Sequence, residues 1–437
     1  MNARPIALMA GAVAIALSAG ALALADRGGP RIRVNDPADT ARVSASIAFF
    51  EDRLVADPLN RTVATQLASR YVMRFQQSAR LDDLERAEQL AREARPLALD
   101  PVEDDARLST LMLMQHRFGE AYDFALRAVT ADPDREVALG ALFDASLATG
   151  RYATVDSLIE NADRDALAWR VRRAQWLDAT GESVSAASVM DAVCDRLERA
   201  GSRAQSLAWC LVELAGTTHG ANGPDAAERI LHRALRTQPG YRGAIEGLAD
   251  LAHARGEWAR AHDLYLDIAT AAHPDIYLRL AEVSRALERD SEAHAWEIRF
   301  LEIAGDPGSE ALFALPLALH LAETPASRGA ALVVAKRDLE RRQAVETWDV
   351  LAWIHFLRGE NQLALAASDS AFRWGAPSPT MLYHRARILY AAGLTGDADT
   401  LLREALADPT LLEPHARAHA ARFNAATETE PRSTRPM

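Results

Sequence analysis

Few residues in this chain have the type and spacing that catalysis or metal binding requires. His415 and His419 lie four residues apart, which could place two metal ligands on one helix face, but no acidic residue stands suitably between them to assist. The glycine-rich stretch 216–223 matches neither nucleotide-binding fingerprint, and no metalloprotease, phosphate-loop or nucleophile-elbow motif occurs. We therefore predict no catalytic residue, no metal site and no cofactor, and we interpret the two histidines as surface residues.

The two cysteines, Cys194 and Cys210, could form a disulfide. They flank a bend expected at 200–202 between two antiparallel helices, so side chains that point inward could face each other. An exported protein meets an oxidising compartment in which such a pair can be oxidised. Two buried, unpaired thiols are the alternative.

Residues 1–25 have the pattern of an export signal. Arg4 precedes an uncharged apolar stretch, Ile6 to Ala25, which ends in Ala-Leu-Ala before Asp26. We favour a signal peptide cleaved after Ala25; the alternative is an uncleaved anchor, because about 20 apolar residues span a bilayer. Residues 26–42 are rich in Gly, Pro and Arg and predict a flexible linker. The folded part is therefore expected in the periplasm, or outside the cytoplasmic membrane on a tether formed by residues 6–25.

The composition is that of a folded protein that does not bind nucleic acid. Of its 437 residues 49% are hydrophobic and 25% are charged, which is enough to bury a large core. The formal net charge is −12, whereas nucleic-acid binding needs clustered positive charge. We therefore expect protein or peptide partners, basic ones if charge contributes.

From Val43 onward, apolar residues recur at helical spacing and no strand-like alternation is evident, so the chain is predicted to be all-α. An internal repeat organises these helices. Small or apolar residues recur at separations of 34, 34, 31, 41, 34, 32, 38, 33 and 34 residues, and each is expected to open the second helix of a pair. The ten positions are Ala87, Ala121, Val155, Ala186, Ala227, Ala261, Ala293, Ala331, Ala364 and Ala398.

The repeats resemble those of the tetratricopeptide repeat family, most clearly from Trp348 to Ala371, and with the export signal they indicate an exported bacterial member of it. Trp348, Leu351 and Ala352 occupy the Trp, Leu and small-residue positions of the family, and Gly359 ends the first helix. This resemblance implies a right-handed superhelical solenoid of about ten helix-turn-helix repeats over residues 43–423. Residues 424–437 are polar and predict a disordered tail.

The resemblance also implies that the first helix of each repeat lines a concave groove. Projecting the repeat register onto that groove predicts an aromatic patch beside an acidic stretch, which suits an extended or helical peptide with apolar and basic side chains. The alternative is that these aromatic residues are half-buried packing residues. The predicted groove residues are Trp353, Phe356, Tyr383, Arg387, Tyr390, Glu246, Asp250 and Glu282.

The function predicted from these patterns is a non-enzymatic scaffold that binds protein or peptide partners at the bacterial cell envelope. One alternative is a membrane-tethered assembly or secretion factor, which differs only if residues 6–25 stay attached. A second alternative is an enzyme whose site is built from groove carboxylates, but no sequence motif supports it.

Overall fold

The computed structural model describes residues 37–78, 81–97, 100–163, 165–269, 273–306, 312–373 and 378–429. The predicted export signal 1–25 and residues 430–437 of the predicted tail lie outside this range. The described chain is helical throughout, with no strand in these ranges, so the all-α prediction is confirmed. No helix among the described residues has the length and apolar character needed to cross a membrane.

Ten helix pairs follow one another within the described residues. Their first helices are α3 (Arg61–Ser78), α5 (Pro101–Met114), α7 (Glu136–Ala148), α9 (Leu167–Ala179), α11 (Ala204–Asn222), α13 (Arg242–Ala254), α15 (Asp275–Ala286), α17 (Ala314–Glu323), α19 (Val345–Leu357) and α21 (Pro379–Ala391). Their second helices are α4 (Leu81–Ala94), α6 (Phe118–Ala131), α8 (Tyr152–Asn161), α10 (Ser183–Arg199), α12 (Pro224–Thr237), α14 (Trp258–Ile268), α16 (Asp290–Ala304), α18 (Arg328–Arg341), α20 (Asn361–Ala371) and α22 (Thr395–Ala405).

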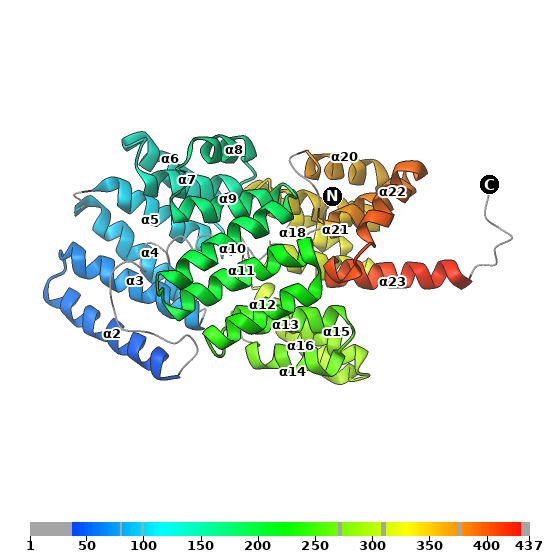
Figure 1. Cartoon of the computed structure of the whole chain (residues 1–437), viewed down its shortest axis with the longest axis horizontal. Coiled ribbons are helices and arrows are strands. Elements are labelled where there is room, and N and C mark those ends of the chain that lie inside the picture. Colours follow the sequence, from blue (N-terminus) through cyan, green and yellow to red (C-terminus); the bar gives the residue numbers. More distant parts are fainter. Residues whose placement is uncertain are drawn as a thin grey trace.

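A single helix stands at each end of these pairs, and three short 3-10 helices join others. The single helices are α2 (Pro37–Ala56) and α23 (Pro414–Thr429); the 3-10 helices are η1 (Arg95–Leu97), η2 (Pro325–Ser327) and η3 (Pro409–Leu411). From α2 to α22, helices adjacent in the chain pack against each other (Figure 1). Several first helices also pack on the first helix of the next pair, such as α5 on α7 and α19 on α21. The chain is therefore a helical-repeat solenoid stacked in chain order.

The repeated small residues lie where the two helices of a pair meet. Each of the ten positions predicted from the period is buried, with 2% or less of its surface exposed. A methyl side chain lets two helices approach closely, and a pair buries its remaining apolar surface against the pairs before and after it. The register predicted from the sequence is thus the register of the fold.

Two glycines that follow first helices have a backbone conformation that other residues rarely adopt, and one of them also allows a distant part of the chain to approach. Gly359 follows α19 with a φ of 75°, the left-handed conformation that ends a helix and that other residues adopt at a cost. Gly150, between α7 and α8, has a similar φ of 74°. A Cβ on Gly150 would lie 2.4 Å from the carbonyl oxygen of Gln343, so this glycine also admits a distant part of the backbone.

The contact at Gly150 joins repeats that are far apart in the sequence. The backbone N–H of Val345 donates to the Tyr152 hydroxyl at 3.2 Å, across 193 residues. The guanidinium of Arg342 lies 5.2 Å from the ring centre of Phe118. The third helix pair therefore contacts the start of the ninth, so repeats that are far apart in the sequence pack together in the superhelix.

Both predicted boundaries of the repeat region are placed differently by the structure. Helix α2 begins at Pro37, within the predicted linker 26–42. Proline is favoured in the first turn of a helix, and Val43 and Ile47 of α2 are buried in the apolar core. Helix α23 continues to Thr429, within the predicted disordered tail 424–437. Ala425 and Ala426 are strong helix formers and prolong a helix that has already been nucleated.

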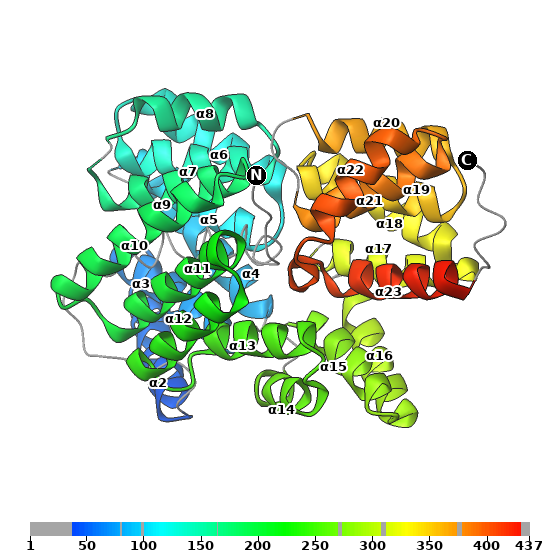
Figure 2. The same cartoon turned by 45° about the vertical axis from the view of Figure 1, so that its right-hand side comes forward.

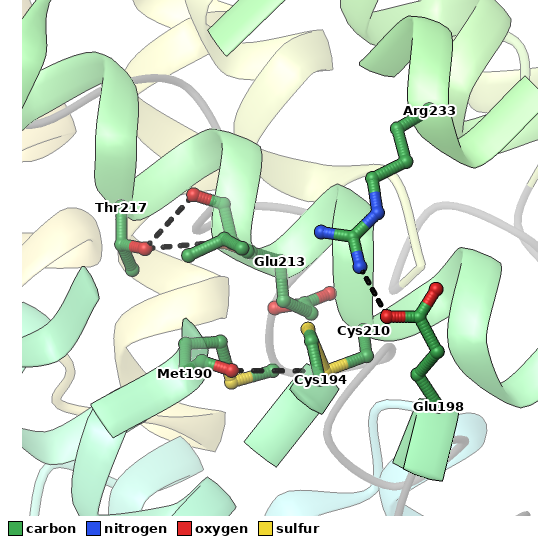
Figure 3. The surroundings of a disulfide bond; sticks show 8 residues. Met190, Cys194, Glu198, Cys210, Glu213, Thr217 and Arg233 are labelled. Atoms are coloured by element: carbon green, nitrogen blue, oxygen red, sulfur yellow. Dashed lines mark hydrogen bonds and ion pairs between the residues drawn. A yellow bond between two sulfur atoms is a disulfide. The ribbon is translucent and has the colours of Figure 1, made fainter. Parts of the chain in front are cut away.

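The sulfur atoms of Cys194 and Cys210 are bonded, joining α10 to α11 (Figure 3). The two Cα atoms lie 5.6 Å apart, and both residues are fully buried. The antiparallel arrangement expected around residues 200–202 is therefore the one that brings them together. Both cysteines of the sequence are used, so the described chain has no free thiol.

Removing this disulfide is expected to destabilise the protein. The bond closes a loop between residues 16 apart, and a loop of that size restricts the unfolded chain by about 3 kcal/mol in the chain-entropy description. We expect the variant Cys194→Ala/Cys210→Ala to lose about that much free energy of unfolding, measured by urea denaturation followed by circular dichroism. Superimposable curves for the variant and the oxidised wild type would contradict a stabilising role for the disulfide.

Candidate partner-binding surface

The C-terminal segment 408–422 defines one side of the solenoid by packing against its first helices. Helix α23 packs on α21, and η3 contacts α13 (Figure 2). The Thr410 hydroxyl lies 3.1 Å from His219 Nε2 on α11, across 191 residues. We call the side of α11, α13, α15, α19 and α21 that faces this segment the inner surface.

The three predicted acidic residues lie on the inner surface near Arg279 and Arg242. Glu246 and Asp250 are one turn apart on α13, and Glu282 lies on α15. Arg279 Nη1 is 3.5 Å from Asp250 Oδ1, and the charge of Arg279 also acts on Glu246 and Glu282. The hydroxyl of Tyr265 donates to Asp250 Oδ1 at 2.6 Å. The acidic stretch predicted from the register is therefore a single cluster in space.

Burial changes the protonation of this cluster. Loss of contact with solvent raises the pKa of Glu246 to about 7, against the opposing charge of Arg242, and raises the pKa of the partly exposed Glu282, against that of Arg279. The neighbouring His253 is neutral, because burial lowers its pKa to about 3. Its Nε2 lies 3.6 Å from Glu282 Oε2. The cluster consequently gains negative charge as the pH rises through neutrality.

The titration of Glu246 predicts a pH-dependent stability difference. In the unfolded chain its pKa returns to the ordinary 4.5, so between pH 4.5 and 7 the folded state binds more protons than the unfolded state. Wild-type stability from this group therefore falls as the pH rises across that range. The free energy of unfolding of Glu246→Gln should therefore increase relative to that of wild type as the pH rises, by an amount on the order of 2 kcal/mol from about pH 4.5 to pH 8.

The measurement is the melting temperature of both proteins at the two pH values. Glu136→Gln, at an exposed position of α7, is the matched control. A difference between Glu246→Gln and wild type that is the same at both pH values would show that Glu246 titrates alike in the folded and unfolded chains.

The predicted aromatic patch is covered by the chain itself. Trp353 and Tyr383 are both fully buried, in a core cluster that includes Leu412, Ala416 and Ala420 of the C-terminal segment. The Tyr383 hydroxyl lies 2.7 Å from His419 Nδ1. The prediction of an open patch is therefore wrong for these two residues, because register identifies the face of a helix but does not show what covers it.

The other predicted aromatic-patch residues lie around the edge of this cluster. Phe356 is partly buried and stacks on Trp353 with ring centres 4.9 Å apart. The Tyr390 hydroxyl donates to Asp399 on α22. Burial lowers the pKa of Arg387. The alternative interpretation, partly buried packing residues, describes these positions better than an exposed ligand site.

Sequence reasoning missed the histidines of the inner surface. His415 and His419, which we interpreted as surface residues, both face the solenoid; His415 Nε2 lies 3.1 Å from His384 Nε2. His384 Nδ1 in turn lies 2.8 Å from Asp349 Oδ2, and its ring stacks on Trp353. The four-residue spacing of His415 and His419 beside the small residues Ala416 and Ala420 was the signal of a buried helix face. Across the described ranges no three His, Cys, Asp or Glu side chains gather in a way that could hold a metal.

The chain is similar to solved helical-repeat structures at low sequence identity. A tetratricopeptide repeat protein from Parabacteroides merdae is 14% identical, with 59% of this chain and 98% of that chain covered and a TM-score of 0.31. Yeast Tom70 is 16% identical, with 94% and 89% covered and a TM-score of 0.37. The human IFIT1 dimer with PPP-AAAA is 14% identical, with 79% and 98% covered and a TM-score of 0.44. No protein-family model and no curated protein sequence matches the chain.

Identities this low concern the fold and carry no partner over to this chain. The classification rests on the molecule's own geometry: helix pairs at a period near 34 residues, small buried residues where the helices of each pair meet, and pairs stacked in chain order. This chain is a helical-repeat solenoid built from consecutive helix pairs.

Proposed function

We propose that this protein is a non-enzymatic scaffold that binds a protein or peptide partner on its inner surface at the bacterial cell envelope. The observation that carries the proposal is the acidic cluster of Glu246, Asp250 and Glu282, which includes the hydrogen bond from the buried Tyr265 to Asp250. Such a surface suits a partner segment with basic and apolar side chains. We infer that it binds without chemistry, because the sequence carries no recognised catalytic motif.

The Cys194–Cys210 disulfide supports the envelope location. Structural disulfides persist in oxidising compartments such as the periplasm and are rare in the cytosol. The apolar segment Ile6–Ala25 supports export in the same direction. In the alternative form of the proposal, that segment stays attached and the protein is a membrane-tethered assembly or secretion factor.

Site-specific photo-cross-linking in the producing cell tests the proposal. A photoreactive amino acid at position 282, whose side chain is 36% exposed on the inner surface, should capture a discrete partner. The matched control is position 333 on α18, where Val333 is 54% exposed. Absence of adducts from position 282, or the same adducts from both positions, would refute partner binding on the inner surface.

Sequencing the mature N-terminus distinguishes the two forms of the proposal. A chain that begins at Asp26 excludes the tether, whereas an intact residue 1–25 segment in the membrane fraction supports it. An activity screen against generic hydrolase substrates tests the enzymatic alternative, which predicts turnover that is lost in Asp250→Asn.

A further inference from the structure

The C-terminal segment makes contacts that stacking of a terminal helix does not require. A helix that only closes the solenoid would rest on the last pair, as α23 does on α21. The turn before it instead reaches the fifth and sixth pairs, where Thr410 meets His219 and η3 contacts α13. The segment 408–422 therefore crosses the inner surface from one part of the superhelix to another.

One face of the segment is apolar. Leu412, Ala416 and Ala420 are spaced four residues apart and are buried against Trp353 and Tyr383. His419 lies on the same side, with its ring edge against Trp353 at 4.9 Å between ring centres. This is the packing of an amphipathic helix laid in an apolar groove.

Arg417 brings positive charge to the acidic cluster. Its Nη2 donates to the carbonyl oxygen of Leu412 at 2.7 Å and its Nε to that of Pro409 at 3.3 Å, which folds the turn around the guanidinium. Burial lowers the pKa of Arg417, and the negative charges of Asp250 and Glu282 counteract that shift. The segment thus has the apolar and basic character for which the inner surface is suited.

We propose that residues 408–422 are an intramolecular ligand of the inner surface, and that the partner binds through a segment of the same chemistry by displacing them. That partner segment is an amphipathic helix that carries small or apolar residues four apart and a basic residue at the position equivalent to Arg417. The inference rests on the proposed function and specifies its ligand. It makes the protein autoinhibited, because the partner must displace the C-terminal segment in order to occupy the site.

The competition follows from effective concentration. A segment tethered to its own site competes at an effective concentration on the order of millimolar, so a free peptide of equal affinity is excluded from the wild-type chain. A substitution that weakens the tethered segment alone opens the site. Arg417→Glu does this, because it removes the guanidinium that donates to the carbonyl oxygens of Leu412 and Pro409 and gives a negative charge to the segment that faces the acidic cluster.

The test uses the full chain and a fluorescein-labelled synthetic peptide with the sequence of residues 408–422. We expect the Arg417→Glu chain to bind this peptide at least tenfold more tightly than the wild-type chain does, by fluorescence anisotropy. The matched control is Arg422→Glu, in which the next arginine of α23 is 62% exposed and pairs with Glu323 at 3.1 Å. It should bind the peptide as weakly as wild type, and a peptide that carries Arg417→Glu should bind neither chain.

Hydrogen exchange at residues 408–422 reports whether the segment has left the surface. Leu412→Asp, which puts a charge at a fully buried position of the segment, is a second way to release it if Arg417→Glu misfolds. A folded, released variant that does not bind the peptide would overturn the proposal, as would equal binding to wild type. A segment that stays protected in both variants would be a fixed structural cap, which also overturns it.

These outcomes are separable from failure of the proposed function. Capture of the same partner, with the same yield, by wild type and Arg417→Glu from position 282 would leave the scaffold function standing and refute autoinhibition. Peptide binding to the released chain, with no partner captured in the cell, would refute the scaffold function and leave the binding of residues 408–422 to the inner surface standing.

Discussion

Replacing Arg172 with alanine is expected to lower the free energy of unfolding by about 3–5 kcal/mol, because it leaves a buried carboxylate without its partner. Arg172 on α9 donates to both oxygens of Asp144 on α7, from Nε at 3.0 Å and from Nη2 at 2.8 Å. The two side chains are only 8% and 5% exposed. Burial raises the pKa of Asp144, and the charge of Arg172 opposes that shift, so the pair is held together at a cost in desolvation.

The residues around Arg172 are complementary in shape to its guanidinium. Gly140 leaves space for it, since a Cβ there would lie 2.8 Å from Nη2. The rings of Phe143 and Trp169 lie 5.8 and 5.4 Å from its central carbon. Lysine cannot reproduce this planar, two-pronged contact, so Arg172→Lys should recover little of the lost stability.

Urea denaturation measures the effect, and α9 provides the control. Arg170 on the same helix pairs with Asp165, which is 87% exposed, so Arg170→Ala should cost less than about 1 kcal/mol. The combined variant Arg172→Met/Asp144→Leu should recover most of the loss, because it removes both charges together. If Arg172→Ala cost no more than Arg170→Ala, the ion pair would not be holding the two repeats together.

The second large effect is expected at Trp353. Its side chain is fully buried on α19, with ring centres 4.1 Å from His384 and 4.9 Å from Phe356. Truncating it to alanine opens a large cavity where α19, α21 and α23 meet, and should cost about 3–5 kcal/mol. Hydrogen exchange should rise in α23 as well, since the indole supports His419.

Trp353→Phe distinguishes the contribution of the aromatic ring to stability from that of the indole N–H. The indole Nε1 is buried and has no hydrogen-bond partner among the described residues, so phenylalanine loses volume but no hydrogen bond. It should cost clearly less than alanine, measured by circular dichroism in urea because the substitution removes a fluorophore. Leu363→Ala, at a position of α20 that is 55% exposed, is the surface control. A cost for Trp353→Ala as small as that of Leu363→Ala would mean that the ring is open to a partner after all.

The sequence by itself determined the helix pairs and their register. Residues such as Ala87, Ala261 and Ala364 recur near every 34 positions, and a small residue is what two closely packed helices need at their contact. The interactions involved are local, within one pair or between consecutive pairs, so periodicity along the chain is sufficient to locate them. The pairing of Cys194 with Cys210 could be predicted for the same reason, because the two residues lie on adjacent helices of consecutive pairs.

Only the tertiary structure decided what faces what across the superhelix. The separations of the repeats vary from 31 to 41 residues, and such variation changes how successive pairs rotate without leaving a signal in any one repeat. The meeting of Tyr152 with Val345, and of His219 with Thr410, depends on the accumulated rotation of more than five pairs. For this reason the helix faces that carry Trp353 and Tyr383 could be predicted, whereas their burial under residues 408–422 could not. Contacts between residues close in sequence follow from local pattern, but contacts across a turn of the superhelix follow from the sum of many small rotations.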